Sequence, residues 1–107
     1  MEYIYSYLTY LEKEKRYSQH TIASYRNDLN QFWSFCKMQF YFNNINDITY
    51  QSIRKWIIYL IESEQISNRS VRRKITALKS FFKFLLRKDI VQKDPTQKII
   101  SPKKSIN

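Results

Sequence analysis

The stretch SNRSVRRKITALKSFFKFLLRK, residues 67–88, decides the fold of this 107-residue chain. Its apolar residues recur at spacings of four, three, four and three, so they stack along one face of a helix. Those residues are Val71, Ile75, Leu78, Phe82 and Leu85. Ser67 is a good N-cap, because its hydroxyl can accept a hydrogen bond from a free amide of the first turn. The stretch is therefore predicted to be an amphipathic helix whose apolar face joins a core.

The polar face of this predicted helix carries only positive charge. Eight basic residues and no acidic residue lie between Arg69 and Lys88. The side chains that point away from the apolar face are Arg69, Arg72, Arg73, Thr76, Lys79, Ser80, Lys83 and Arg87. Like charges one turn apart destabilise a helix slightly, and a helix that only needed solubility would include glutamates. The pattern indicates an anionic partner; the alternative is a solvated basic face without one.

Three more helical patterns precede this stretch. Together they predict helices near residues 2–15, 19–38, 50–64 and 68–88, with Ser18 and Thr49 as N-caps of the second and third. The inward residues of the first three helices are Ile4, Tyr7 or Leu8, Leu11, Ile22, Tyr25, Leu29, Phe32, Cys36, Ile53, Trp56, Ile57, Leu60 and Ile61. No glycine occurs in the chain, which argues against a fold with many tight turns of positive φ and against glycine-rich phosphate loops. The sequence therefore predicts an all-α, compact four-helix domain without strands.

The charge of the chain lies in its last part. Residues 1–66 carry seven basic and seven acidic side chains, whereas residues 67–107 carry twelve basic and two acidic ones, which gives the whole net charge of +10. A localised basic surface is typical of proteins that bind a phosphate backbone. Residues 89–107 carry a weaker pattern and are predicted to be a tail or linker after a domain of residues 1–88. Within this tail, Asp94 and Pro95 are predicted to open one short turn.

Little in the sequence points to catalysis or to a metal. Cys36 is the only cysteine and His20 the only histidine, so neither a disulfide nor a multi-thiolate metal site is expected. Asp28 and Asp47 are interpreted as residues of polar faces. Six of the nine tyrosines are interpreted as core or core-edge residues, namely Tyr3, Tyr5, Tyr7, Tyr10, Tyr25 and Tyr59. We expect no cofactor, no small-molecule substrate and no catalysis by this chain. No signal peptide or membrane-spanning run is visible, so a cytoplasmic location is the expectation.

Two motifs resemble those of one family. The string SVRRKITALKSFFKFLLRKD, followed by DP and SPK, resembles the end of the N-terminal domain of tyrosine recombinases of the phage-integrase and Xer type. The second predicted helix is similar as well, with the pattern S-x-x-T-x-x-x-Y-x-x-D-L-x-x-F beginning at Ser18. The resemblance covers nearly the whole chain and implies a SAM-like core-binding domain. It also implies that this domain and a separate C-terminal catalytic domain clamp opposite sides of duplex DNA.

The resemblance implies a set of DNA contacts on the second and fourth helices. Carried over by position, these are Ser18, Thr21, Ser24, Arg26, Ser67, Arg69, Ser70, Arg73, Thr76 and Lys79. Lys79 stands where many members carry arginine, which puts a bidentate guanine contact there in doubt. The catalytic Arg, Lys, His and Tyr of such enzymes would belong to the second domain, beyond Lys104. The implied partners are double-stranded DNA and other recombinase protomers.

Two other functions remain open on sequence alone. A basic helical module could bind a membrane surface or an acidic protein if the apolar run Phe81 to Leu86 were exposed. A standalone DNA-binding or excisionase-like protein would have the same basic helix.

Overall fold

The computed structural model describes residues 1–102, and the end of the predicted tail, residues 103–107, lies outside them. The elements are α1 (Glu2–Lys13), α2 (Gln19–Phe40), the short 3-10 helix η1 (Ile45–Asp47), α3 (Tyr50–Glu62) and α4 (Asn68–Arg87). Residues 1–102 contain no strand. The all-α prediction is confirmed, and each α-helix ends within two residues of its predicted bounds. The connection between the second and third helices is shorter than the predicted bounds imply, because α2 continues to Phe40 and is followed by η1.

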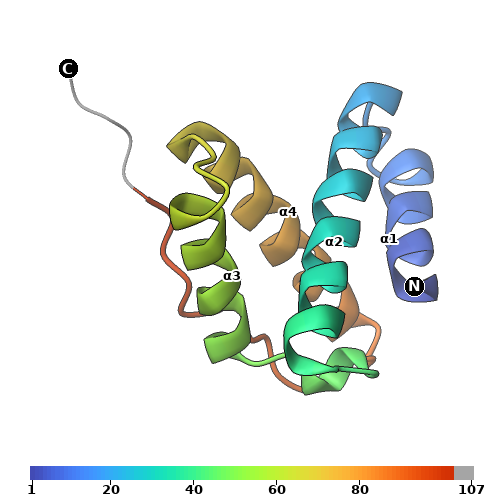
Figure 1. Cartoon of the computed structure of the whole chain (residues 1–107). Coiled ribbons are helices and arrows are strands. Elements are labelled where there is room, and N and C mark those ends of the chain that lie inside the picture. Colours follow the sequence, from blue (N-terminus) through green and yellow to red (C-terminus); the bar gives the residue numbers. More distant parts are fainter. Residues whose placement is uncertain (103–107) are drawn as a thin grey trace.

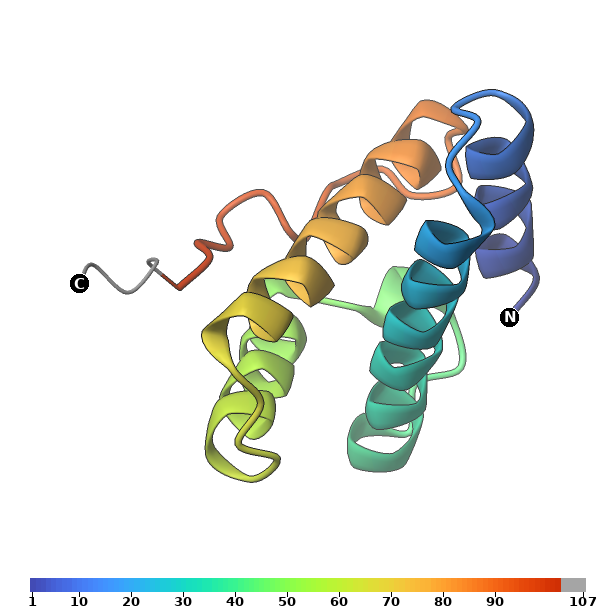
Figure 2. The same cartoon turned by 90° about the horizontal axis from the view of Figure 1, so that it is seen from above.

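The helices α2 and α4 form the centre of the fold (Figure 1). Each of them packs against the other and against both α1 and α3, whereas α1 and α3 do not contact each other. Figure 2 shows the consequence, with α1 beside α2 on one side and α3 beside α4 on the other. The two helices predicted to face DNA are therefore also the two that contact every other α-helix.

Serine and threonine begin three of the helices, as predicted. Ser18, Thr49 and Ser67 are the N-caps of α2, α3 and α4, and each hydroxyl accepts a hydrogen bond from a backbone amide three residues later. In α3 the arrangement is reciprocal, because the Ser52 hydroxyl accepts from the amide of Thr49. These bonds satisfy amides that have no partner within the helix.

Glycine is absent, yet the chain uses the left-handed backbone region four times in residues 1–102. Arg16, Tyr41, Gln65 and Asp89 have φ values of 55°, 58°, 52° and 57°. Each lies just after the end of an α-helix, where a left-handed residue closes the last turn. Arginine, tyrosine, glutamine and aspartate therefore occupy helix ends where glycine would take the same backbone conformation at less cost.

The core fills the space between the four α-helices with aromatic and aliphatic side chains. Its largest fully buried members include Trp56, Tyr7, Phe32 and Phe82. The ring of Phe32 in α2 packs edge-on against Trp56 of α3, with centroids 5.0 Å apart. Of the predicted inward residues, Ile61 is the exception, with 41% of its surface exposed.

Part of the predicted tail also packs on this core. Val91, Thr96 and Ile99 are all buried. As predicted, Asp94 opens a short turn, because its carboxylate accepts hydrogen bonds from the amide and hydroxyl of Thr96. The division after residue 88 stays a prediction, but these contacts show that residues 91–99 are not simply a solvated extension.

Candidate nucleic-acid interface

All ten predicted DNA-contacting side chains are accessible to solvent. Ser18, Arg26, Ser67, Arg69, Arg73 and Thr76 are exposed, and Thr21, Ser24, Ser70 and Lys79 are half-buried. The first four in sequence order lie between the N-cap and the eighth residue of α2, and the other six lie between the N-cap and the twelfth residue of α4. Their accessibility is a condition for contact with DNA, while the contacts themselves stay a prediction.

Four of the six hydroxyl groups in this set form two matching pairs at helix starts. At α2, Ser18 donates to the hydroxyl of Thr21 over 3.0 Å and accepts from the Thr21 amide over 3.1 Å. At α4, Ser67 makes the same two bonds with Ser70, at 3.3 and 3.2 Å. The capping bonds fix where these oxygens lie, and helix N-termini favour negatively charged groups.

Asp28 is the main departure from the sequence interpretation. It was expected on a polar face, but only 1% of it is exposed. Its carboxylate accepts from Nε and Nη2 of Arg73, at 3.1 and 2.9 Å, and from Nζ of Lys74 at 2.9 Å. The amide oxygen of Gln31 accepts a further bond from Lys74 over 2.7 Å. This cluster joins α2 to α4 across the centre of the fold.

The two cations that contact Asp28 differ in their exposure to solvent. The side chain of Lys74 is 9% exposed, whereas that of Arg73 is 47% exposed. The hydrogen bonds that Arg73 donates to the Asp28 carboxylate raise the pKa of Arg73 above its ordinary value. Helical periodicity does not place Lys74 among the core residues. The sequence signal that could have marked the cluster is the spacing of Asp28, three residues after Tyr25 and four before Phe32 on the apolar stripe of α2.

The other cations of α4 have varied surroundings. Arg72 donates to the carbonyl of Pro102 over 3.4 Å, and Arg87 donates to the hydroxyl of Tyr10 over 3.0 Å. Lys88 lies over the ring of Phe84. Within residues 1–102, no side-chain hydrogen bond or ion pair holds Arg69, Lys79 or Lys83. These three remain available for a partner along the exposed length of α4.

The apolar run of α4 is not available for a membrane. Phe81, Phe82, Phe84 and Leu85 are all buried, and Leu86 alone of the apolar residues is exposed, at 39%. No helix of the described residues is long and apolar enough to cross a membrane. The membrane-surface alternative therefore lacks the apolar face on which it depended.

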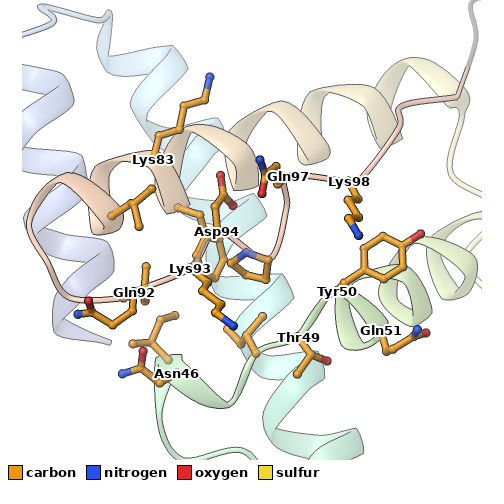
Figure 3. Close-up of a pocket in the computed structure, with 16 residues that line it drawn as sticks. Asn46, Thr49, Tyr50, Gln51, Lys83, Gln92, Lys93, Asp94, Gln97 and Lys98 are labelled. Carbon is orange, nitrogen blue, oxygen red and sulfur yellow. The ribbon is translucent and has the colours of Figure 1, made fainter.

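A groove lies elsewhere on the molecule, between the start of α3, the end of α4 and residues 91–98 (Figure 3). Its polar lining includes Lys83, Lys93, Lys98 and Asp94, and its floor includes Val91. None of the ten predicted DNA contacts lines it. Within residues 1–102, no group of three or more His, Cys, Asp or Glu side chains is placed to hold a metal ion.

The comparison with known families decides the class of this fold. The model described as "Phage integrase, N-terminal SAM-like domain" matches residues 4–89. The chain belongs to this family. The match runs from the first turn of α1 to just past the end of α4, so it includes both helices that carry the predicted contacts.

Curated members of the phage-integrase family are similar over most of the chain. "Tyrosine recombinase XerC" of Anoxybacillus flavithermus is 37% identical over 98 residues, which is 92% of this chain and 32% of that protein. The proteins of the same name from Roseiflexus castenholzii and Bacillus subtilis are 40% and 36% identical, over 95% and 91% of this chain and 32% and 31% of their own lengths. The chain thus spans about a third of the length of these relatives. No solved structure matches it.

Proposed function

We propose that this chain is the DNA-binding, or core-binding, domain of a site-specific tyrosine recombinase, and that it grips duplex DNA with α2 and α4. The observation that carries the proposal is the cationic surface of α4 in a member of the phage-integrase N-terminal family. Seven of the eight basic residues between Arg69 and Lys88 are at least partly exposed, and no acidic residue interrupts them. Duplex DNA, with its two rows of phosphates, is the anionic partner that such a surface fits.

The geometry of α4 suits a groove of the duplex. A helix rises about 1.5 Å per residue, so its 20 residues make a rod of about 30 Å. This length is close to one helical turn of DNA, and the major groove is wide enough to admit a helix. Arg69, Arg73 and Lys79 would then reach phosphates or base edges, with the capped start of α2 at a neighbouring phosphate.

We also propose that strand cleavage and rejoining belong to the remainder of a longer recombinase, which acts together with other protomers. Incubation of this chain with supercoiled DNA should give neither nicked product nor a covalent tyrosyl adduct. The reason is that a phosphodiester attack needs imidazole and cationic partners around the scissile phosphate, whereas His20 lies exposed in the first turn of α2. A phosphotyrosine-linked product would contradict this proposal.

A salt titration tests the binding proposal. The affinity of the chain for a labelled duplex should fall steeply with salt, by roughly 0.9 log unit per log unit of salt for each phosphate contact. Lys79→Ala should lower that slope by about one if Lys79 meets a phosphate, and should relax sequence preference at an unchanged slope if it reads a base.

The matched control is Lys55→Ala on α3, which removes the same charge from an exposed position outside the proposed interface. Lys55→Ala should change affinity much less than Lys79→Ala. Equal losses would mean that net charge, rather than the α2 and α4 surface, drives binding. Tighter binding to anionic vesicles than to duplex DNA would favour the alternative of a basic module for membranes.

A further inference from the structure

The cluster of Asp28, Arg73 and Lys74 has more positive charge than its internal pairing requires. One carboxylate, 1% exposed, accepts hydrogen bonds from two cations. The charges +1, +1 and −1 sum to +1, and the buried Lys74 compensates Asp28 from the inside. The surplus charge therefore appears on Arg73, whose side chain is 47% exposed.

We propose that Asp28 is a positioning residue for DNA binding, and that it holds Arg73 so that the outer edge of its guanidinium meets a pair of acceptors on the duplex. Those acceptors are two phosphate oxygens or the O6 and N7 atoms of a guanine. The buried Lys74 keeps the Arg73 charge available by neutralising Asp28 from the inside. This inference rests on the proposed function.

The hydrogen bonds of Arg73 leave the required edge of the guanidinium open. A guanidinium has five N–H donors in a fixed plane, and Asp28 accepts from Nε and from one N–H of Nη2. The second N–H of Nη2 and both of Nη1 point to the other sides of the plane. Two of these donors form the fork that recognises phosphate or guanine. Because Asp28 already fixes the plane, less rotamer entropy is lost on binding.

Stability alone does not account for this arrangement. Burying a charged pair costs desolvation that its attraction often fails to repay, and well-packed apolar residues are frequently as stable. A structural pair would also need only one cation, whereas here Arg73 and Lys74 both contact Asp28. Recognition of a phosphate or a guanine requires an arginine whose orientation is fixed and whose positive charge is not neutralised.

A double-mutant cycle tests the positioning role. The parent, Asp28→Asn, Arg73→Ala and the double variant are each bound to a pool of labelled duplexes with a randomised central segment, and the bound duplexes are sequenced. We expect Asp28→Asn to reduce the preference for the selected site about tenfold in the parent if Arg73 meets a guanine, which is the size of one bidentate contact, or to lower the salt slope on the selected duplex by about one if Arg73 meets a phosphate. Neither change should occur when Arg73 is already alanine. An equal effect in both backgrounds, or no effect in either, would overturn the inference.

The direction of the accompanying change in DNA affinity distinguishes a positioning role of Asp28 from a simple effect of its negative charge. Asp28→Asn adds one positive charge, so non-specific binding should strengthen even though the contact that Arg73 makes is weakened. If Arg73 meets a phosphate, Arg73→Ala should lower the salt slope by about one with preference unchanged at any single base. If it meets a guanine, the preference at one position should be lost instead. Both outcomes support a contact that Asp28 positions, provided that the cycle shows coupling.

Two further variants keep the inference testable if Asp28→Asn does not fold. Arg73→Lys keeps the charge at an exposed position but cannot form the fork, so it should lose site affinity about tenfold. Lys74→Met removes a buried cation and should weaken DNA binding more than Lys55→Met, although Lys74 cannot reach DNA itself. Circular dichroism first establishes that each variant is folded at the temperature used. Parent-like binding by Arg73→Lys, or equal losses from the two methionine variants, would overturn the inference.

The outcomes also separate this inference from the proposed function. A parent chain that binds no duplex in the pool would refute the proposed function and this inference with it. A parent that binds with a salt-dependent affinity but shows no coupling between Asp28 and Arg73 would refute the inference alone.

Discussion

Leu78 occupies the middle of the buried face of α4, and only 1% of it is exposed. Leu78→Ala should reduce the free energy of unfolding by about 2–5 kcal/mol, because it removes buried methyl groups and leaves a cavity. Leu86→Ala in the same helix is the matched control, since Leu86 is 39% exposed. Denaturant unfolding followed by circular dichroism measures both. Equal transition midpoints for Leu78→Ala and the parent would mean that α4 is packed differently.

The stability of the fold depends on pH in the alkaline range, because it buries a thiol and tyrosine hydroxyls in their protonated forms. Burial raises the pKa of the Cys36 thiol from 9.0 to about 12, and burial likewise raises the pKa values of Tyr7 and Tyr25. The folded state therefore keeps protons that the unfolded state releases, so stability is fully present below pH 9.0 and declines as the pH rises towards 12. The parent should lose more unfolding free energy than Cys36→Ala between about pH 8 and pH 10, by up to about 1 kcal/mol. Parallel pH profiles would contradict the burial of the thiol.

At the residue scale, sequence reasoning succeeds where burial follows from local spacing and fails where it depends on distant partners. Cys36 lies on the apolar stripe of α2, and its burial is confirmed. Asp28 is buried only because Arg73 and Lys74, 45 and 46 residues away, supply its hydrogen bonds. The periodicity of α2 does not contain that information, so the sequence does not predict the cluster of Asp28, Arg73 and Lys74.

Among the α-helices, α3 has the most complete N-terminal cap, because its capping bonds are reciprocal. The Thr49 hydroxyl accepts from the amide of Ser52 over 3.2 Å, and the Ser52 hydroxyl accepts from the amide of Thr49 over 3.0 Å. Thr49→Ala should reduce the free energy of unfolding by about 0.5–2 kcal/mol, because one of these amides loses its partner. Thr9→Ala, at an exposed position within α1, should change stability little or raise it slightly. Thermal unfolding of both variants measures the difference, and equal effects would argue against the reciprocal cap.

The bounds and types of the helices were predictable from sequence because spacing and capping act within a few residues. Ser18, Thr49 and Ser67 begin their helices as predicted. Ile61 is 41% exposed although its neighbour Leu60 is fully buried, because the only α-helices that α3 contacts are α2 and α4 and the part of α3 that they cover does not include Ile61. Which part of an apolar face is covered depends on how helices cross, and a single helix pattern does not specify that.

On the scale of the whole molecule, the segment after α4 is part of what must fold. Ile99 is 5% exposed and packs with the main core, whereas its neighbour Ile100 is 87% exposed. Ile99→Ala should therefore cost about 2–4 kcal/mol of unfolding free energy, and Ile100→Ala should have almost no effect. Urea unfolding of the two variants makes a comparison in which the chemistry is identical and only the burial differs. If both match the parent, the domain ends with α4 as the sequence pattern suggested.

The same segment shows why the extent of the domain was harder to predict than its helices. Val91, Thr96 and Ile99 follow no helical period, because they lie on irregular backbone. Figure 1 shows this segment running beside α3, and Val91 and Ile99 are part of the core that the helices form. Only the assembled molecule brings these residues together.

The four left-handed residues at the helix ends mean that this chain has not reached the stability its backbone allows. An L-residue in that region costs roughly 1–2 kcal/mol, and glycine avoids the cost. Because Arg16, Tyr41, Gln65 and Asp89 lie at separate helix ends, the gains from replacing them with glycine should be nearly additive. A variant with glycine at all four positions should melt several degrees higher than the parent, by roughly 4–8 °C for each kcal/mol gained. Such a variant would give engineers a more heat-resistant scaffold with the core unchanged and all ten candidate contacts in place.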